Sequence, residues 1–480
     1  MTQSSAIRAN ALQSILDSSR IFVDPSILAA YTIHDQTPAA AAKPASAEEA
    51  AEIVRFAAAE KLALIPCGAR TKLAIGAPPA RYDIALDMTG LYQIAHYDPA
   101  DLTLSVDSGT PLAALNATLF EHKQFLPLLT PYYSASTVGG TIAAGLDSPL
   151  RQFYGTARDF LLGAEFIDGT GSLVKSGGRV VKNVAGYDLH KLLIGSLGTL
   201  AVITRLNFRT FPTPIAGSRG FLASFPSRET ALDLRRKIAE SQTAPLTLDV
   251  LNPAAAGIFA TRTPLMPEPQ LFARETRGTP QTALPLPGEW FRPHEWQVCA
   301  AFAGVPEVLD RCARDLTRFA EDSRASAISI LDDTTRPSVW GRLREALPLF
   351  RESSPAAVIL RLNILPTHHA NAITVLEAVA RSARLPLALI ARAAGPLYVA
   401  LLPEAANDAS LEKLAFLTTE VFALSRSHHG DASLLFAPPA LQRLLTFPAP
   451  APPALHLMHR LKSAFDPHNV LAPNRLPPTI

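Results

Sequence analysis

Three loops rich in glycine and other small residues interrupt the N-terminal half of the chain, at residues 66–73, 134–145 and 195–200. Small residues let the main chain approach a ligand closely, and successive backbone N–H groups can form a concave site for an anion. The pattern therefore favours a binding site assembled from main chain rather than from a few long side chains.

The first of these loops follows a predicted helix and a predicted strand. Ser46 and Glu49 have the spacing of a capping box, which predicts a helix running to about Lys61, and a short apolar strand follows at residues 62–65. Arg70 and Lys72 carry positive charge that a diphosphate would require. An ordinary basic surface loop has the same composition, so this loop alone leaves both interpretations open.

The other two loops have equally plain alternatives. Gly139 and Gly140 suit either close contact with a flat ligand or a tight-packing turn, and Gly198 suits either a ring edge or a helix C-cap without a ligand. If the glycines face a ligand, we expect Gly139→Val and Gly198→Val to abolish its binding while changing little elsewhere in the fold.

Other nucleotide-binding and catalytic patterns do not occur in the sequence. No G-x-G-x-x-G opens a predicted helix, and no G-x-x-x-x-G-K-[ST] is present. Residues 168–171 instead form a hairpin signal between predicted strands at 161–167 and 172–174. The zinc-helix pattern H-E-x-x-H and the nucleophile elbow G-x-S-x-G are also missing.

Composition narrows the class of protein further. The length of 480 residues suggests two or three domains, and a net charge of +2 argues against a nucleic-acid surface or a polybasic membrane patch. Three cysteines, at 67, 299 and 312, point to a reducing compartment and are too few for an ordinary iron–sulfur cluster. Neither a secretory signal nor an apolar run of bilayer-spanning length is predicted, so we expect a cytoplasmic protein.

The pattern of predicted secondary structure changes near residue 214. Beyond it, predicted strands and helices alternate, which predicts an α+β domain of β-α-β units. A proline-rich stretch at residues 253–293 has no periodicity and is predicted to be a surface insert. The expected segments are an N-terminal approach (1–40), a domain built around the loops (41–214), an α+β cap (215–448) and a C-terminal segment returning to the first domain (449–480).

These loops, in this order, resemble the FAD-binding domain of the vanillyl-alcohol-oxidase family, the PCMH-type fold, and most closely the FAD-binding subunits of bacterial glycolate oxidases. The resemblance covers roughly residues 45–215 and 455–480 and implies an α+β fold with a two-subdomain FAD-binding domain and a cap. Its strongest stretches are residues 155–163, 182–189 and 195–200, with Phe465-Asp466-Pro467 and Pro473-Asn474-Arg475 near the C-terminus.

The resemblance also implies how FAD would be held. Relatives with covalent flavin carry a histidine in the first loop, and this chain has none there, so the FAD is expected to be non-covalent. The first loop would hold the diphosphate, and the other two would line the rest of the cofactor. The residues expected to contact FAD are Pro66, Cys67, Gly68, Ala69, Arg70, Thr71, Lys72, Leu73, Thr137, Val138, Gly139, Gly140, Thr141, Gly145, Gly198, Thr199, Leu200, Ile203 and Arg475.

The cap departs from one pattern of the resemblance. Relatives that oxidise D-2-hydroxy acids carry His-x-Gly-Asp-Gly-Asn-x-His, whereas residues 428–435 read His-His-Gly-Asp-Ala-Ser-Leu-Leu. His428 keeps the first histidine, but Leu435 replaces the second, so a pair of imidazoles for a metal ion is not available and no metal site is expected. His428 is the candidate catalytic residue, and a partly buried histidine with no catalytic role is the alternative.

For function, the resemblance implies an FAD-dependent oxidoreductase acting on CH–OH groups. The first hypothesis is a subunit of a glycolate-oxidase-like complex, with a paralogous flavin subunit and an iron–sulfur subunit as partners and glycolate as a typical small 2-hydroxy acid substrate. Such partners would place the chain peripherally at the inner membrane. The alternative is a self-sufficient dehydrogenase whose base and carboxylate clamp would come from His428, Arg361 and Arg392. A flavin-free scaffold is the third hypothesis, and the intact glycine-rich loops argue against it.

Overall fold

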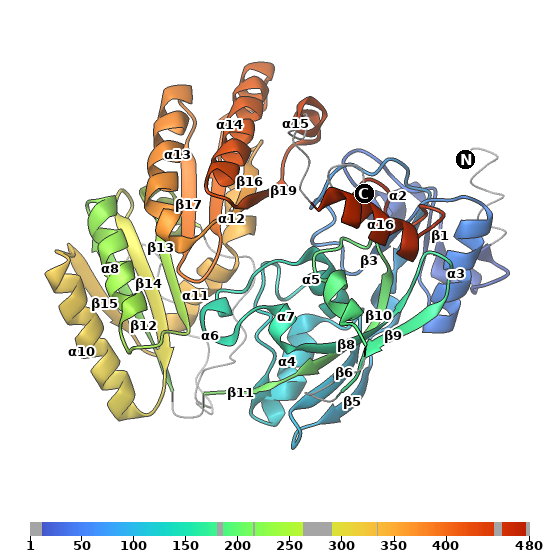
Figure 1. Cartoon of the computed structure of the whole chain (residues 1–480), viewed down its shortest axis with the longest axis horizontal. Coiled ribbons are helices and arrows are strands. Elements are labelled where there is room, and N and C mark those ends of the chain that lie inside the picture. The colour runs from blue at the N-terminus through green and yellow to red at the C-terminus, as the bar shows by residue number, and fades with distance from the viewer. Residues whose placement is uncertain are drawn as a thin grey trace.

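The computed structural model describes residues 12–179, 186–214, 217–262, 290–333, 335–445 and 454–476. Two halves lie next to each other in Figure 1, the N-terminal half in blue to green and the cap in light green to orange. The last helix, α16 (Leu455–Phe465), returns from the cap to the N-terminal half, where it lies near β3 in Figure 1.

The N-terminal half contains two sheets with different strand directions. In the first, β2, β4 and β3 are parallel and β1 is antiparallel, in the order β1-β2-β4-β3. The second is antiparallel, in the order β5-β6-β10-β8-β9. The strands are β1 (Ile21–Phe22), β2 (Ala40–Ala42), β3 (Leu64–Cys67), β4 (Ile84–Asp87), β5 (Ile94–Asp98), β6 (Thr103–Asp107), β8 (Leu161–Ile167), β9 (Leu173–Gly177) and β10 (Val202–Arg209), with a separate pair β7 (Gln124–Phe125) and β11 (Phe211–Pro212).

Helices cover and join these two sheets. They are α2 (Pro25–Leu28), α3 (Ala47–Ala59), α4 (Leu112–Glu121), α5 (Val138–Ala144), α6 (Arg151–Tyr154) and α7 (Ala157–Phe160), with 3-10 turns η1 (Ser18–Arg20), η2 (Ala29–Tyr31), η3 (Met88–Gly90) and η4 (Leu189–Leu193). The predicted cap of α3 is confirmed, since the Ser46 side chain accepts a hydrogen bond from the Glu49 amide at 3.1 Å. The Glu49 carboxylate pairs with Arg20, which ties α3 to the 3-10 turn η1, and accepts a hydrogen bond from the Ala45 amide.

The cap is one eight-stranded antiparallel sheet, in the order β15-β12-β14-β13-β17-β18-β16-β19. The predicted β-α-β connections exist, but a third strand lies between the two strands of each unit, so every neighbouring pair is antiparallel. The strands are β12 (Ser218–Phe225), β13 (Thr247–Leu251), β14 (Trp296–Ala303), β15 (Ala327–Leu331), β16 (Val358–Asn363), β17 (Leu387–Arg392), β18 (Leu397–Leu401) and β19 (Asp431–Phe436).

This sheet is a tandem of two similar motifs, each with the order β-α-β-β-α-β along the chain. The first contains α8 (Arg228–Glu240) and α10 (Pro306–Asp322), and the second contains α13 (His369–Ala383) and α14 (Asp408–Ser427). The motifs meet where β13 pairs with β17, at the centre of the sheet. No repeat was predicted from the sequence, because the two motifs share topology rather than a short sequence period.

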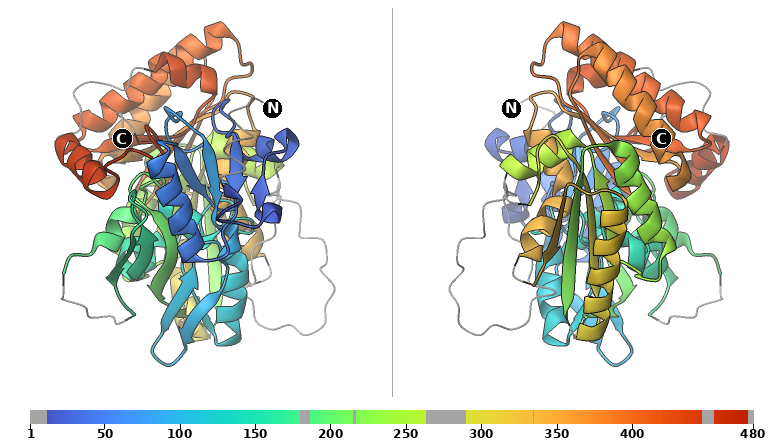
Figure 2. Two further views of the ribbon diagram at one scale, coloured as in Figure 1. Left: turned by 90° about the vertical axis from the view of Figure 1, so that its right-hand side faces the viewer. Right: turned by 90° about the vertical axis from the view of Figure 1, so that its left-hand side faces the viewer.

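The two faces of the cap sheet have different neighbours. α8, α10, α13 and α14 cover the outer face, as the right view of Figure 2 shows, and their apolar residues form a core of their own with the sheet. The inner face shares a second core with the N-terminal half, to which Leu104, Phe208, Phe259 and Ile390 belong. Because one apolar core crosses between the halves, the cap is packed against the first half rather than tethered to it.

The predicted surface insert at residues 253–293 is wrong at its two ends. Pro253–Thr261 forms helix α9, whose N-cap Asn252 accepts a hydrogen bond from the Ala255 amide at 3.0 Å. Phe259 in this helix and Phe291 are fully buried, with their rings 5.5 Å apart. The helix was missed because it is short and nearly all apolar, which gives no periodic pattern. Residues 263–289 of the insert lie outside the described residues.

Three shorter helices complete the cap and its return: α11 (Arg336–Arg344), α12 (Ala346–Glu352) and α15 (Pro439–Leu444), with a 3-10 turn η6 (Pro366–His368). The C-terminal segment then joins the first sheet, because the Leu64 amide donates to the Val470 carbonyl and the Ala472 amide to the Leu64 carbonyl. Within the described ranges, no helix combines the length and apolar character needed to cross a bilayer. The predicted α+β class is confirmed.

Candidate FAD-binding site

A cavity of about 760 Å³, including its open mouth, lies where six separated segments of the chain meet. The main ones are the loop after β3, helix α5, the start of β10 and Arg475 near the C-terminus, and Met88 and Ser108 come from the other two. The segments come together in the N-terminal half, where Figure 1 shows α5, β3 and β10 near one another.

Most of the residues expected to contact FAD line this cavity. They are Pro66, Cys67, Gly68, Ala69, Arg70, Thr71, Lys72, Leu73, Thr137, Gly139, Gly140, Gly198, Ile203 and Arg475. Those expected but not in the lining are Val138, Thr141, Gly145, Thr199 and Leu200.

Helix α5 explains part of that difference. The second loop was predicted as irregular main chain, but residues 138–144 are helical, and a helix presents only one face to a cavity. Gly139, Gly140, Ala143 and Ala144 face the cavity, whereas Val138 lies fully buried in the core. The sequence analysis also missed the lining residues Ile65, Met88, Ser108, Ala143, Ala144, Leu197 and Ala201, which carry no signal apart from their small or apolar character.

The first loop offers backbone donors to the cavity. Within the part of the chain that the structure describes, the amides of residues 69–72 donate to no carbonyl of the protein. Arg70 has φ +62°, a left-handed conformation of the kind that occurs in anion-binding turns of the main chain. Unused amides in a loop of small residues suit the diphosphate of a dinucleotide, which needs several short donors and little side-chain bulk.

The glycines around the cavity serve packing between protein segments more directly than contact with a ligand. A Cβ on Gly68 would lie 2.0 Å from Thr137 Oγ1, one on Gly139 2.5 Å from Ser108 Cβ, and one on Gly198 2.6 Å from the Pro66 ring. The expectation that Gly139→Val and Gly198→Val would leave the fold unchanged is therefore wrong. These glycines let the loops approach one another, and the cavity exists because they do.

Arg70 is already neutralised by the protein. Its guanidinium forms an ion pair with Asp87 at 2.9 Å and lies over the Tyr31 ring at 4.6 Å. Asp87 also accepts a hydrogen bond from the Tyr31 hydroxyl at 2.6 Å. The side chain of Arg70 therefore lines the cavity with its charge balanced.

Arg475 supports the loop from behind. Its guanidinium donates to the Ala77 carbonyl at 2.6 Å, to the Leu73 carbonyl at 2.6 Å and to the Ile75 carbonyl. The side chain is almost fully buried, and this burial lowers its pKa to about 10, so it stays charged at neutral pH. Arg475 thus fixes the path of residues 73–77 from the C-terminal end of the chain.

Lys72 lines the cavity without a carboxylate partner among the described residues, and unlike Arg475 it is not held by backbone carbonyls of the loop. Its Nζ donates to Ser136 Oγ and lies 3.4 Å from Thr71 Oγ1, and both of these atoms are neutral hydroxyl oxygens. The Tyr132 ring lies 5.9 Å from Nζ. Burial lowers the pKa of Lys72 to about 7, against a smaller opposing effect of Glu345.

Two further polar groups of the lining bear on cofactor chemistry. Ser108 Oγ is buried without a hydrogen-bond partner, so it has donor and acceptor capacity left for a bound molecule. Burial raises the pKa of the Cys67 thiol well above its usual value, so the reactive thiolate is disfavoured. No histidine is among the lining residues.

His428 does not belong to this cavity. It forms the C-cap of α14, and its Nε2 lies 3.1 Å from Asn371 Oδ1 while its ring stacks on His368 at 4.7 Å. Leu435, at the second position of the motif, is buried in the core. Among the described residues, no three histidine, cysteine or acidic side chains are grouped as metal ligands.

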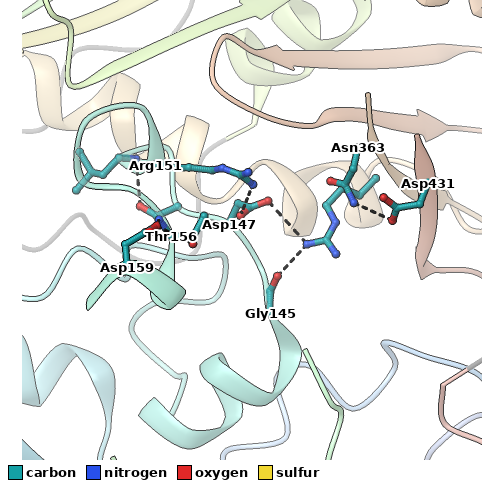
Figure 3. A network of polar contacts seen from close by, with 10 residues as sticks. Gly145, Asp147, Arg151, Thr156, Asp159, Asn363 and Asp431 are labelled. Carbon is teal, nitrogen blue, oxygen red and sulfur yellow. Dashed lines mark hydrogen bonds and ion pairs between the residues drawn. The ribbon is translucent and has the colours of Figure 1, made fainter. Parts of the chain in front are cut away.

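The cap touches the cofactor half through a polar network beside the end of α5. Arg361, from β16, donates to the Gly145 carbonyl at 2.8 Å and lies 3.8 Å from Asp147, which also pairs with Arg151 at 2.9 Å. Figure 3 shows Gly145 and Asp147 opposite the strand that carries Asn363. The other cap arginine considered as a clamp, Arg392, is buried against Asp249 at 3.1 Å.

Comparisons with known proteins identify two domain families along the chain. An FAD binding domain matches residues 38–177. The C-terminal domain of FAD linked oxidases matches residues 218–476, and this second match alone covers more than half of the chain.

Among similar proteins, glycolate oxidase subunit GlcE of Escherichia coli strain K12 is 36% identical over 42% of this chain and 55% of its own length. The D-2-hydroxyglutarate dehydrogenase of Xanthomonas citri pv. viticola is 31% identical over 47% of this chain and 49% of its own length. These two matches thus span about half of each relative. Glycolate oxidase subunit GlcD of Bacillus subtilis strain 168 is 22% identical over 92% of this chain and 90% of its own length.

Solved structures share the whole fold. A substrate-bound p-cresol methylhydroxylase has a TM-score of 0.74 at 16% identity, over 99% of this chain and 97% of that one. The 4-ethylphenol oxidase of Gulosibacter chungangensis has a TM-score of 0.73 at 16% identity, again over 99% of this chain and 97% of that one. With both domain families matched in order along one chain, this protein belongs to the FAD linked oxidases, and FAD is its cofactor.

Proposed function

We propose that the cavity after β3 is the FAD site of this oxidoreductase and that the cofactor is held without a covalent bond. The observation that carries the proposal is the array of amides at residues 69–72, which fits a diphosphate, in a cavity whose lining has no histidine and whose single cysteine is a poor nucleophile. The bound flavin supplies the capacity to accept two electrons, and the protein supplies position and charge.

The site assignment has a direct test. The purified chain is expected to absorb as a flavoprotein, and its flavin is expected to stay in the supernatant after acid precipitation, because no bond holds it. Flavin that precipitates with the protein would contradict non-covalent binding. A colourless protein that takes up no added FAD would contradict the site itself.

We further propose that the chain is a subunit of a glycolate-oxidase-like complex, in which electrons from a small 2-hydroxy acid pass to an iron–sulfur partner. The similarity to glycolate oxidase subunits supports this proposal. So does the cap: Arg392 is committed to Asp249, and the second histidine of the relatives' motif is Leu435. A partner that carries the iron–sulfur clusters, and holds the complex at the membrane, would supply what this chain does not.

A self-sufficient dehydrogenase is the second candidate, and one observation favours it. Arg361 is largely buried at the domain interface, its Nε has no hydrogen-bond partner, and it reaches Gly145, which follows the cavity residue Ala144. A guanidinium in this place could bind a carboxylate.

One pair of measurements separates the two candidates. The chain purified from its native host should bring along a paralogous flavin subunit and an iron–sulfur protein, identified by mass. The isolated chain, loaded with FAD, should reduce an artificial acceptor with neither glycolate nor D-lactate. Turnover by the isolated chain that falls in Arg361→Met would favour the self-sufficient enzyme instead.

A further inference from the structure

The described residues that line the FAD cavity include two lysine or arginine side chains from the first loop, and they differ in how their charge is balanced. Arg70 has Asp87 at 2.9 Å. Lys72 is buried, and among the described residues the hydrogen-bond partners of its Nζ are the hydroxyl oxygens of Ser136 and Thr71, with the Tyr132 ring 5.9 Å away. A buried ammonium without a counter-ion is costly, so such a group is either neutral or waits for an anion.

The protein fixes Lys72 in place through the cap. Glu345, from the junction of α11 and α12, accepts hydrogen bonds from the amides of Tyr132 and Tyr133 at 2.7 and 3.3 Å. Ser136 Oγ in turn donates to the Tyr132 carbonyl at 2.7 Å, which leaves its lone pairs for the Lys72 amine. Glu345 of the cap thus fixes the segment that carries Ser136, and Ser136 accepts the hydrogen bond from the Lys72 amine.

We infer that the ammonium group of Lys72 is the counter-ion of the FAD diphosphate, and that binding of FAD draws a proton from solvent onto this side chain. The diphosphate is the anionic part of oxidised FAD, and the free amides of residues 69–72 belong to the same loop as Lys72. This inference rests on the proposed FAD site.

The charged and titratable groups around Lys72 leave it as the group that changes charge near neutrality. Burial raises the pKa of the Cys67 thiol, so it stays protonated. Burial also raises the pKa of Tyr132. The remaining neighbours are the carboxylates Glu345 and Asp87 and the guanidinium groups of Arg70, Arg344, Arg351 and Arg475.

The direction of the pH dependence follows. In the free protein, burial holds the pKa of Lys72 at about 7, and a neighbouring diphosphate raises it in the complex. Below pH 7 both states carry the proton, so this group gives no slope. Above pH 7 the free amine must take up a proton to bind, so the affinity falls by up to tenfold per pH unit until the pKa of the complex is reached.

The experiment is titration of the full-length apoprotein with FAD between pH 6 and 9, and separately with ADP, a probe that carries the diphosphate and adenosine but no flavin, above pH 7.5, where its terminal phosphate is ionised. The parent should lose affinity for both above pH 7, and calorimetry in buffers of different ionisation enthalpy should show proton uptake at pH 8. Lys72→Arg should bind without this slope or uptake. Lys72→Met should bind at least tenfold more weakly at pH 6 and also without a slope, whereas Lys175→Met, at an exposed lysine, should match the parent.

The contrary outcomes are distinct. FAD bound with a flat profile and no proton uptake in the parent would overturn the inference and leave the FAD site intact. A slope retained in Lys72→Met, or seen with FAD but not with ADP, would also overturn it. Failure to bind FAD at any pH would instead overturn the proposed site. If Lys72→Met does not fold, the proton uptake of the parent and of Lys72→Arg decides the question.

Discussion

The loop after β3 and the central seam of the cap sheet both bury positive charge, and they handle it in opposite ways. In the seam, Arg392 on β17 lies opposite Asp249 on β13, and the two side chains pair at 3.1 Å. In the loop, the hydrogen bonds of the Lys72 ammonium go to hydroxyl oxygens rather than to a carboxylate. The seam satisfies its own charge and so joins the two motifs of the cap, whereas the loop leaves charge and amides unsatisfied for a ligand.

This difference separates two ways in which a buried polar group is retained. Burying an ion pair requires desolvation of both ions, which their attraction offsets, so the loss of one partner is strongly destabilising. A buried charged group without a partner lowers the stability of the ligand-free protein, and binding of a ligand restores that stability. The seam should therefore respond to mutation in stability, and the loop in FAD affinity.

The largest effect should come from breaking the seam. Arg392→Met leaves the Asp249 carboxylate buried without its partner, and we expect it to lower the free energy of unfolding by about 3–5 kcal/mol. Urea unfolding measures this loss. The double variant Arg392→Met with Asp249→Leu should recover much of it, because no charge is left alone.

A matched control is Arg236→Met. Arg236 is more than half exposed and pairs with Asp233 and Glu240 on the surface of α8, so its loss should change stability by less than about 1 kcal/mol. Equal losses in Arg236→Met and Arg392→Met would show that burial does not distinguish the seam.

The next effect should appear in cofactor affinity. Arg475→Met removes three hydrogen bonds from a charged group to the carbonyls of residues 73, 75 and 77, each worth about 1.5–3 kcal/mol where it is buried. We expect FAD affinity to fall at least tenfold, since the loop loses its fixed path. Arg443→Met, at an arginine that is 66% exposed, is the control in the same fluorescence titration. Unchanged affinity in Arg475→Met would mean that the loop keeps its shape without this support.

The smallest effect should come from adding one methyl group between the loops. In Gly139→Ala, the new Cβ would lie 2.5 Å from Ser108 Cβ and 2.9 Å from the Ser108 carbonyl oxygen, so the segments must separate, at a cost of about 1–3 kcal/mol. Gly178→Ala is the control, because nothing lies within 4 Å of the added atom. Thermal unfolding should separate the two variants, and FAD affinity should fall only in the first. The same melting temperature for both would contradict the packing role of Gly139.

Local signals predicted much of the cap. Helix α8 (Arg228–Glu240) lies where the sequence predicts alternating strands and helices, because Ser227 caps it and its apolar residues recur at helical spacing. The hairpin of β8 and β9 also forms where residues 168–171 predict a turn. The strand order could not be predicted, because the pairing partner of each cap strand is decided by contacts far along the chain rather than by its own residues.

The candidate cofactor site was likewise predicted only in part. The first loop was predicted as a whole because its small residues are contiguous. The second was predicted too broadly, since α5 turns Val138 and Thr141 away from the cavity, and whether a glycine-rich segment is helix or loop depends on its neighbours. The proposed domain boundaries remain a prediction.

The sequence by itself determined the family, the cofactor and the loop of small residues whose main chain can approach a diphosphate. Only the tertiary structure decided which charges that loop keeps available. Arg70 and Lys72 are two residues apart and look equivalent in the sequence, but Asp87, 17 residues on, neutralises the first, and Ser136, 64 residues on, offers the second only a hydroxyl. Electrostatic balance is set by distance in space, so it could be determined only after the chain had folded.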